Sequence, residues 1–192
     1  MRLTALALRQ PLVLALPRGG VPVAAEVARR LHLPFDVLVT RKITHPDDPE
    51  TVLGAVAEGD VVSLTEHARR LERQELQELA DQARAEVYRL VAAYRRGRRL
   101  PDIRGRDVVL VDDGMETGVS AEAALKALRQ RNPARLVLAV PVCAETSHSR
   151  LTALADDVIC VLTPPDSPFT HWYDDFAPAT DEQILALLPT VG

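Results

Sequence analysis

Short, continuously apolar runs alternate with longer segments of helical spacing, and this alternation restricts the possible fold more than any other feature. Five runs predict strands buried on both faces, because they are apolar throughout and not alternately polar. They are residues 12–16, 35–40, 107–111, 135–140 and 158–162, with 51–59 as a weaker candidate. Helical spacing covers 21–32, roughly 120–131 and 145–155. The pattern predicts an α/β fold with a mainly parallel sheet flanked by helices, and ligands at the carboxyl ends of the strands.

Residues 65–96 depart from this alternation. They form a polar amphipathic stretch that ends in "YRRGRR", and its apolar positions make a stripe on one side of a helix. The stretch predicts a helical insertion, as one helix or a helix pair packed on the edge of the sheet. A lid or a dimer arm is the functional alternative. At 192 residues the chain fits a single domain over 1–192.

Charge and apolar content exclude several classes of partner. The net charge is −4, so no basic field indicates binding to nucleic acid or to an anionic membrane. The apolar start is interrupted at residues 9–11 and does not resemble a signal peptide, and no run is long enough to span a membrane. Cys143 and Cys160 lie in apolar runs without CxxC spacing, which favours buried free thiols over a disulfide. We therefore expect a cytoplasmic protein.

The segment "VVLVDDGMETGVS" (108–120) carries the strongest chemical signal. Asp112 and Asp113 end a buried strand, and a Gly-bounded loop then opens a helix, so that main-chain N–H groups and the helix N-terminus can receive an anion. Thr117 and Ser120 add hydroxyl donors. The spacing is neither that of a Walker A loop nor that of the dinucleotide fingerprint. An acidic β-turn is the simpler alternative, but the flanking strand and helix favour a site for a phosphorylated sugar.

This segment closely resembles the motif of type I phosphoribosyltransferases that binds 5-phosphoribosyl 1-pyrophosphate (PRPP). The resemblance implies that Asp112 and Asp113 hold the ribose hydroxyls. It further implies that the loop binds the 5′-phosphate through Gly114, Met115, Glu116, Thr117, Gly118, Val119 and Ser120.

Two further segments are similar to other loops of that family. "LVLALPRGGVPVAAEVARRL" is a strand, a tight turn and a helix, in which Arg18 supplies charge and Gly19 and Gly20 permit close approach to an anion. The turn resembles the pyrophosphate loop, which implies a cis peptide bond between Pro17 and Arg18. Arg41 and Lys42 close another strand where the family has its flexible catalytic loop, and are implied to bind pyrophosphate. An ordinary βα turn and a solvated loop are the alternatives.

The order of "LPRGGVPVA", "RK" and "VDDGxxTG" resembles a bacterial group of predicted phosphoribosyltransferases, whose members usually begin with an additional helix. The C-terminal "HWYDDFAPATDEQI" also resembles that group. In the small C-terminal hood region that the resemblance implies, Trp172 and Tyr173, or Phe169, are candidates to stack a base, with core or rim packing as the alternative. The resemblance implies a pentosyltransferase of nucleotide metabolism, with a nitrogenous base as acceptor and a homodimer as assembly. Mg²⁺ is expected to bind mainly through PRPP, with Asp112 and Asp113 as candidate ligands.

Glu116 departs from the small residue common at its position in that family. A carboxylate about 5–6 Å from the phosphate would cost roughly 1.5–6 kcal/mol, so its side chain should face elsewhere. In members that act on 6-oxopurines an Asp at this position is an acid/base toward the purine ring nitrogen, which favours a purine acceptor and purine salvage. Glu116 is thus either catalytic, together with Arg41 and Lys42, or a solvent-facing bystander. A non-catalytic PRPP or nucleotide sensor is the alternative function.

Overall fold

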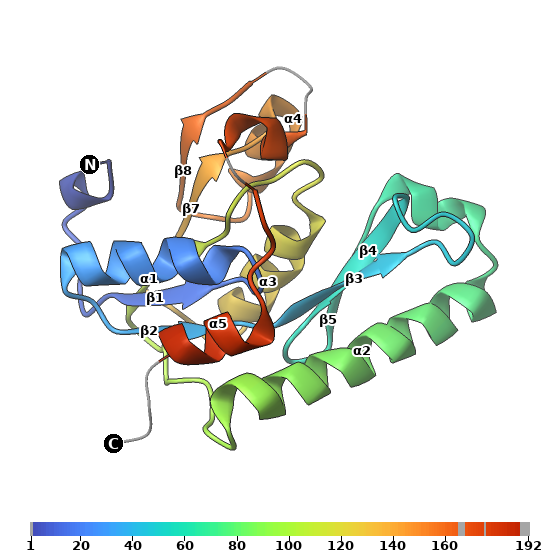
Figure 1. Cartoon of the computed structure of the whole chain (residues 1–192), viewed down its shortest axis with the longest axis horizontal. Coiled ribbons are helices and arrows are strands. Elements are labelled where there is room, and N and C mark those ends of the chain that lie inside the picture. The colour runs from blue at the N-terminus through green and yellow to red at the C-terminus, as the bar shows by residue number, and fades with distance from the viewer. Residues whose placement is uncertain (1, 165–167, 175, 189–192) are drawn as a thin grey trace.

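The computed structural model describes residues 2–164, 168–174 and 176–188, whose strands form two sheets (Figure 1). The larger sheet has the strand order β2-β1-β6-β7-β8, and every neighbouring pair is parallel. Its strands are β1 (Leu12–Ala15), β2 (Phe35–Val37), β6 (Asp107–Val111), β7 (Arg135–Val142) and β8 (Asp157–Leu162). The apolar runs therefore supply a parallel sheet, as predicted.

Helices cover both faces of this sheet, because the side chains of each strand alternate between two cores. One core joins Val13 and Val109 to α1 (Gly20–Leu31) and α5 (Asp181–Leu187). The other joins Leu14 and Leu110 to α3 (Val119–Arg129) and α4 (Glu145–Leu151). The predicted helices are confirmed, although α4 ends four residues earlier than the spacing suggested. Burial on both sides explains why the strands are continuously apolar.

The second sheet is an antiparallel arm that extends from the first (Figure 1). It consists of β3 (Thr40–Thr44), β4 (Val52–Ala57) and β5 (Val61–Leu64). The apolar run 35–40 is thus divided between the two sheets. Ala55 and Ala57 pack on α3, so this helix contributes to the cores of both sheets.

The predicted insertion is only partly helical. The arm's long helix, α2, runs over Arg73–Arg95 and follows a 3-10 turn at Glu66–Arg70. Val87 and Leu90 pack with Ile43 and Leu53 of the arm, so α2 covers the second sheet, whereas the sequence predicts packing on the edge of the parallel one. Further 3-10 turns lie at Arg2–Ala5 and Phe169–Trp172.

A buried ionic cluster joins the arm to the parallel sheet. Arg95, 1% exposed, donates to Glu58 and to the carbonyl of Val37, and its Nε lies 3.9 Å from Asp36 Oδ1. Arg98 lies 3.3 Å from the same Asp36 carboxylate. Because a buried charge is tolerated only when it is paired, the cluster fixes the position of the C-terminal end of α2.

The structure corrects the cysteine prediction. Cys143 and Cys160 are buried, as expected, but their sulfur atoms form a disulfide. Cys143 directly follows β7 and Cys160 lies in the adjacent strand β8, which places their Cα atoms 6.2 Å apart, within the usual range for a disulfide. Across the described ranges, none of the helices combines the length and hydropathy that a membrane crossing requires.

Candidate functional site

A cavity of about 390 Å³ lies at the carboxyl ends of β1 and β6, where the sequence predicts ligand binding. The turn after β1, loop 114–120, the start of β3, the C-terminal half of α2 and the C-terminal hood form its walls. Its predicted site residues are Arg18, Gly19, Arg41, Lys42, Asp112, Asp113, Gly114, Met115, Glu116, Thr117, Gly118, Val119 and Ser120. Three motifs far apart in the sequence thus meet in one cavity.

The two adjacent acids form the floor of this cavity. Asp112 and Asp113 are partly buried, and the Asp113 N–H donates to Asp112 Oδ1 at 3.0 Å. Burial first, and then the charge of Asp113, raise the pKa of Asp112 well above its usual value, and burial raises the pKa of Asp113. The positive charge of Lys42 lowers the pKa of both carboxyls and so partly offsets these effects.

The turn after β1 packs directly on the acids. The peptide bond between Pro17 and Arg18 is cis, as predicted. A Cβ at Gly19 would overlap the Asp113 carboxyl group, and one at Gly20 would lie 2.7 Å from the Val111 carbonyl oxygen. Gly20 therefore lets the turn approach the end of β6 closely, and Gly19 leaves room for the Asp113 carboxyl group.

Loop 114–120 presents only some of its groups to the cavity. The Met115 N–H donates to the Val142 carbonyl at 3.0 Å, and the Met115 side chain is buried, so this residue joins the loop to the end of β7. Gly118 adopts a left-handed conformation (φ 63°) directly before α3 begins. The groups free to meet an anion are therefore near Thr117, Gly118 and Ser120, at the N-terminal end of α3.

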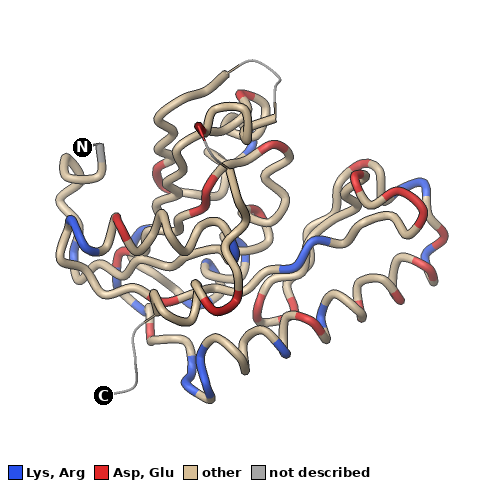
Figure 2. Tube along the Cα trace, viewed as in Figure 1, with Lys and Arg blue, Asp and Glu red and all other residues tan. Residues whose placement is uncertain are grey.

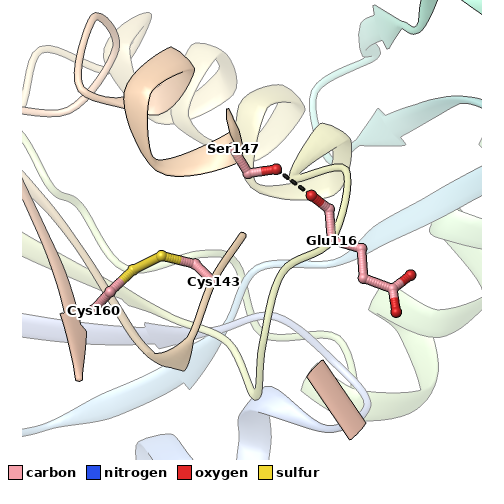
Figure 3. Close-up of a disulfide and its surroundings, with 4 residues drawn as sticks. All are labelled: Glu116, Cys143, Ser147 and Cys160. Carbon is pink, nitrogen blue, oxygen red and sulfur yellow. Dashed lines mark hydrogen bonds between the residues drawn. A yellow bond between two sulfur atoms is a disulfide. The ribbon is translucent and has the colours of Figure 1, made fainter. Parts of the chain in front are cut away.

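Glu116 faces away from α4 and contributes to the cavity wall. Its carbonyl accepts a hydrogen bond from Ser147, whereas its exposed carboxylate extends from the opposite side of the loop (Figure 3). The nearby Cys143 is disulfide-bonded and the Ser147 hydroxyl donates to this carbonyl, so these residues do not form a nucleophile–base pair.

The three predicted pyrophosphate-binding cations lie in different surroundings. Figure 2 shows acids and bases interspersed along the trace, with a basic stretch in β3 where it leaves the parallel sheet. Arg41 and Lys42 are both exposed. Lys42 acts electrostatically on the acids of the cavity floor, and Arg41 on Glu86 of α2, consistent with opposite faces of a strand.

Arg18 is held near the C-terminal helix in this structure. Its Nε lies 3.5 Å from Asp181 Oδ1, and the buried Tyr94 hydroxyl donates to the same oxygen at 2.7 Å. Burial and the hydrogen bond to Asp181 raise the pKa of Tyr94 to about 12. The end of α2, the start of α5 and the turn after β1 therefore meet at one carboxylate.

The hood places its aromatic residues differently relative to the cavity, and base stacking by Trp172 or Tyr173 stays a prediction. Trp172 is 49% exposed and lies outside the cavity lining, and the Tyr173 hydroxyl donates to the Asp113 carbonyl at 2.5 Å. Phe169, the alternative, does line the cavity, and so does Phe176, with their rings in edge contact at 5.3 Å between centroids. A Cβ at Gly114 would overlap the Phe169 ring, so this glycine lets the hood close on the loop.

Sequence reasoning missed several residues of the wall. Leu90 and Tyr94 come from α2, and Phe176 and Pro178 from the hood. The aromatic run "HWYDDF" pointed to the hood but not to which rings face inward. The two α2 positions gave no separate signal, because in sequence they belong to the apolar stripe of a surface helix.

Comparisons with known proteins agree with this arrangement. A family model for the phosphoribosyl transferase domain matches residues 2–177. Two proteins from strains of Mycobacterium tuberculosis, each named "Putative phosphoribosyl transferase", are 37% identical over 191 residues, or 97% of this chain. The match covers 43% of each relative, so the chain spans less than half of their length.

A solved structure has the same fold. The crystal structure of TT1426 from Thermus thermophilus shares 45% identity and a TM-score of 0.79, and the match covers 97% of this chain and 90% of that one. The parallel sheet and its flanking helices are those of the type I phosphoribosyltransferase fold. The chain belongs to the phosphoribosyl transferase domain family.

Proposed function

We propose that the protein transfers the 5-phosphoribosyl group of PRPP to a ring nitrogen of a purine-type base and releases pyrophosphate. The observation that carries the proposal is the single cavity in which the turn at Arg18, the acid pair Asp112–Asp113 and loop 114–120 meet. A phosphorylated ribose with an anionic leaving group needs such a set: cations at one end, hydroxyl acceptors in the middle and N–H donors at the other end.

In this proposal the acid pair accepts hydrogen bonds from the two ribose hydroxyls. Loop 114–120 and the start of α3 bind the 5′-phosphate through N–H groups near Thr117 and Gly118. The pyrophosphate lies toward Arg18, Arg41 and Lys42. Lys42 is well placed for this, because its charge already acts on the carboxyls beside the expected position of C1.

Magnesium is part of the proposal. Within the described residues no group of three or more acidic, His or Cys side chains could hold a metal ion alone, but Asp112 and Asp113 offer the hard oxygen ligands that Mg²⁺ prefers. Such an ion, completed by PRPP oxygens and water, would neutralise charge on the leaving pyrophosphate. The donor set therefore fits an ion that arrives with its ligand.

The chemical step exchanges one bond for another at C1. The bond from C1 to the pyrophosphate oxygen breaks and its electron pair leaves with pyrophosphate, while the ring nitrogen forms a bond to C1. The proton released from the nitrogen needs an acceptor, and the carboxylate of Glu116 projects from the loop beside the cavity. The base would lie near Phe169 and Phe176, whose rings are the aromatic part of the wall.

Pyrophosphate release, measured across a panel of purine and pyrimidine bases with PRPP and Mg²⁺, tests the reaction. We expect release with a purine acceptor. In Glu116→Ala, kcat should fall by about 100-fold or more with the KM for PRPP unchanged, because proton transfer is lost and ribose binding is not. Glu145→Ala, an exposed acid outside the cavity, is the matched control. Unimpaired turnover in Glu116→Ala would remove the acid/base role, and PRPP binding without turnover on any base would support a sensor.

Three further expectations remain predictions: homodimer assembly, cytoplasmic location and a single domain over 1–192. Because the curated relatives are more than twice as long as this chain, the activity of a complete protein of their type is also a proposal.

A further inference from the structure

Helix α4 lies against the outer side of loop 114–120 and is hydrogen-bonded to two consecutive carbonyls of that loop. The buried Ser147 hydroxyl donates to the carbonyl of Glu116 (Figure 3), and the Arg150 guanidinium donates to the carbonyl of Thr117. We propose that Ser147 and Arg150 are positioning residues that hold the loop in its phosphate-binding conformation. The proposal rests on the function above, since it concerns the 5′-phosphate site of PRPP.

The two carbonyl contacts also fix the direction of the N–H groups in the same peptide bonds. In a trans peptide the C=O of one residue and the N–H of the next point in opposite directions. With the carbonyls of Glu116 and Thr117 turned toward α4, the N–H groups of Thr117 and Gly118 point away from it. Within the described part of the chain, neither N–H donates to another protein atom. Two free donors are thereby aimed together, as an anion site requires.

Arg150 and α4 are in turn held in place by contacts with α3 and with the loop. Arg150 Nε lies 3.4 Å from the largely buried Glu122 carboxylate of α3, and Glu122 also accepts from Lys126 at 2.7 Å. A Cβ at Gly118 would lie 3.0 Å from Leu151 Cδ1, so α4 leaves no space for the loop to move back. Arg150 therefore contacts both the Thr117 carbonyl and the Glu122 carboxylate.

The end of β7 and the residue that precedes α4 also bind the loop. The Met115 N–H donates to the Val142 carbonyl at 3.0 Å, and the Ala144 N–H donates to the Met115 carbonyl at 2.9 Å. The carbonyls of residues 115, 116 and 117 thus each accept a hydrogen bond from the segment 144–150. Arg150 is the one cation among these contacts, and its charge also polarises the Thr117 peptide, which makes the Gly118 N–H a stronger donor.

Calorimetric titration with ribose 5-phosphate and, separately, with pyrophosphate tests the proposal. In Arg150→Ala we expect about tenfold weaker binding of ribose 5-phosphate, the loss of roughly one hydrogen bond, and unchanged affinity for pyrophosphate. Ser147→Ala should act in the same direction, and Arg150→Lys should restore part of the affinity. Arg129→Ala is the matched control, because Arg129 is equally exposed and contacts an acid and a carbonyl far from the loop.

Three results would overturn the inference. Unchanged affinity for ribose 5-phosphate in Arg150→Ala would show that the loop needs no support from α4. Equal losses for ribose 5-phosphate and pyrophosphate would indicate a general structural role. If the wild-type protein binds pyrophosphate but no ribose 5-phosphate or PRPP, the proposed function fails, and the positioning role fails with it.

Discussion

Replacing Gly19 by Ala should disable ribose binding while leaving the fold intact. The backbone at Gly19 is in the right-handed helical region (φ −65°, ψ −30°), so Ala causes no conformational strain there. Its Cβ would, however, overlap the Asp113 carboxyl group, which is the end of a side chain and can rotate away. Rotation removes the carboxylate that we propose accepts a ribose hydroxyl. Losing one hydrogen bond to a charged group, about 1.5–3 kcal/mol, corresponds to about 10- to 150-fold weaker PRPP binding.

Gly20→Ala provides the contrast within the same turn. An added Cβ would lie 2.7 Å from the Val111 carbonyl oxygen and 2.9 Å from the Asp112 Cα, both of them backbone atoms that cannot rotate away. Overpacking of this kind costs about 1–3 kcal/mol, which for a chain of this length lowers the Tm by about 2–12 °C. Gly20→Ala should therefore reduce stability, and Gly19→Ala should reduce affinity.

Stability is measured for each variant by thermal unfolding, and affinity by calorimetric titration with PRPP and Mg²⁺. Wild-type affinity in a folded Gly19→Ala protein would refute the placement of Asp113 at the ribose. A large loss of Tm in Gly19→Ala, equal to that in Gly20→Ala, would show that the turn and not the carboxylate is the critical element.

The remaining predictions concern charge and covalent links. Burial raises the pKa of Asp112 above its unfolded-state value of about 3.9, so the protonated carboxyl costs no folding free energy at low pH, and the cost grows as pH rises through the raised pKa. In urea unfolding, Asp112→Asn should therefore exceed wild type in stability by more at pH 8 than at pH 5. An equal stability difference at the two pH values would contradict this. Arg95→Met leaves Glu58 without its buried partner and Asp36 with Arg98 alone, and should lower the free energy of unfolding by about 3–5 kcal/mol. A loss under about 1 kcal/mol would show that the cluster is solvated. Reduction of the Cys143–Cys160 disulfide should lower the free energy of unfolding by about 3 kcal/mol, because the bond closes a loop with 17 residues of separation. A Tm that a thiol reductant does not change would contradict a disulfide in solution.

The parallel sheet and the position of the cavity could be predicted from sequence because burial on both faces leaves a direct mark. The strand before Asp112 is continuously apolar, and a loop rich in small and hydroxyl residues follows it. The turn at Gly19 and Gly20 was equally visible, since two glycines after a buried strand indicate close approach of the backbone. These signals are local, so a single sequence is enough to show them.

The arm was harder to predict because its features depend on contacts between distant segments. The apolar run 35–40 does not show that the chain changes sheets after Val37, and β5 is only four residues long. "YRRGRR" is a polar, basic stretch in sequence, yet its first Arg, Arg95, is buried against Asp36 of β2 and Glu58, which directly follows β4. Burial of a charge is decided by its partners, and the sequence does not pair them.

The disulfide was not predictable, and the inward-facing hood aromatics could not be chosen, for the same reason. Apolar surroundings are the same for a free thiol and for a half-cystine, and only the path of the chain just after β7 brings Cys143 to Cys160. Trp172, Tyr173 and Phe169 were all candidates to stack a base, and the structure lines the cavity with Phe169 and Phe176. For Glu116, the structure places the carboxylate beside the cavity, and its acid/base role stays a proposal.

Titration of the wild-type protein with PRPP in the presence of Mg²⁺ tests the central claim most directly. We predict saturable binding at one site per chain, and loss of that binding in folded Asp112→Asn and Asp113→Asn proteins, because both carboxylates are expected to hold the ribose. A folded wild-type protein that binds no PRPP, or acid variants that bind it as tightly as wild type, would contradict the account.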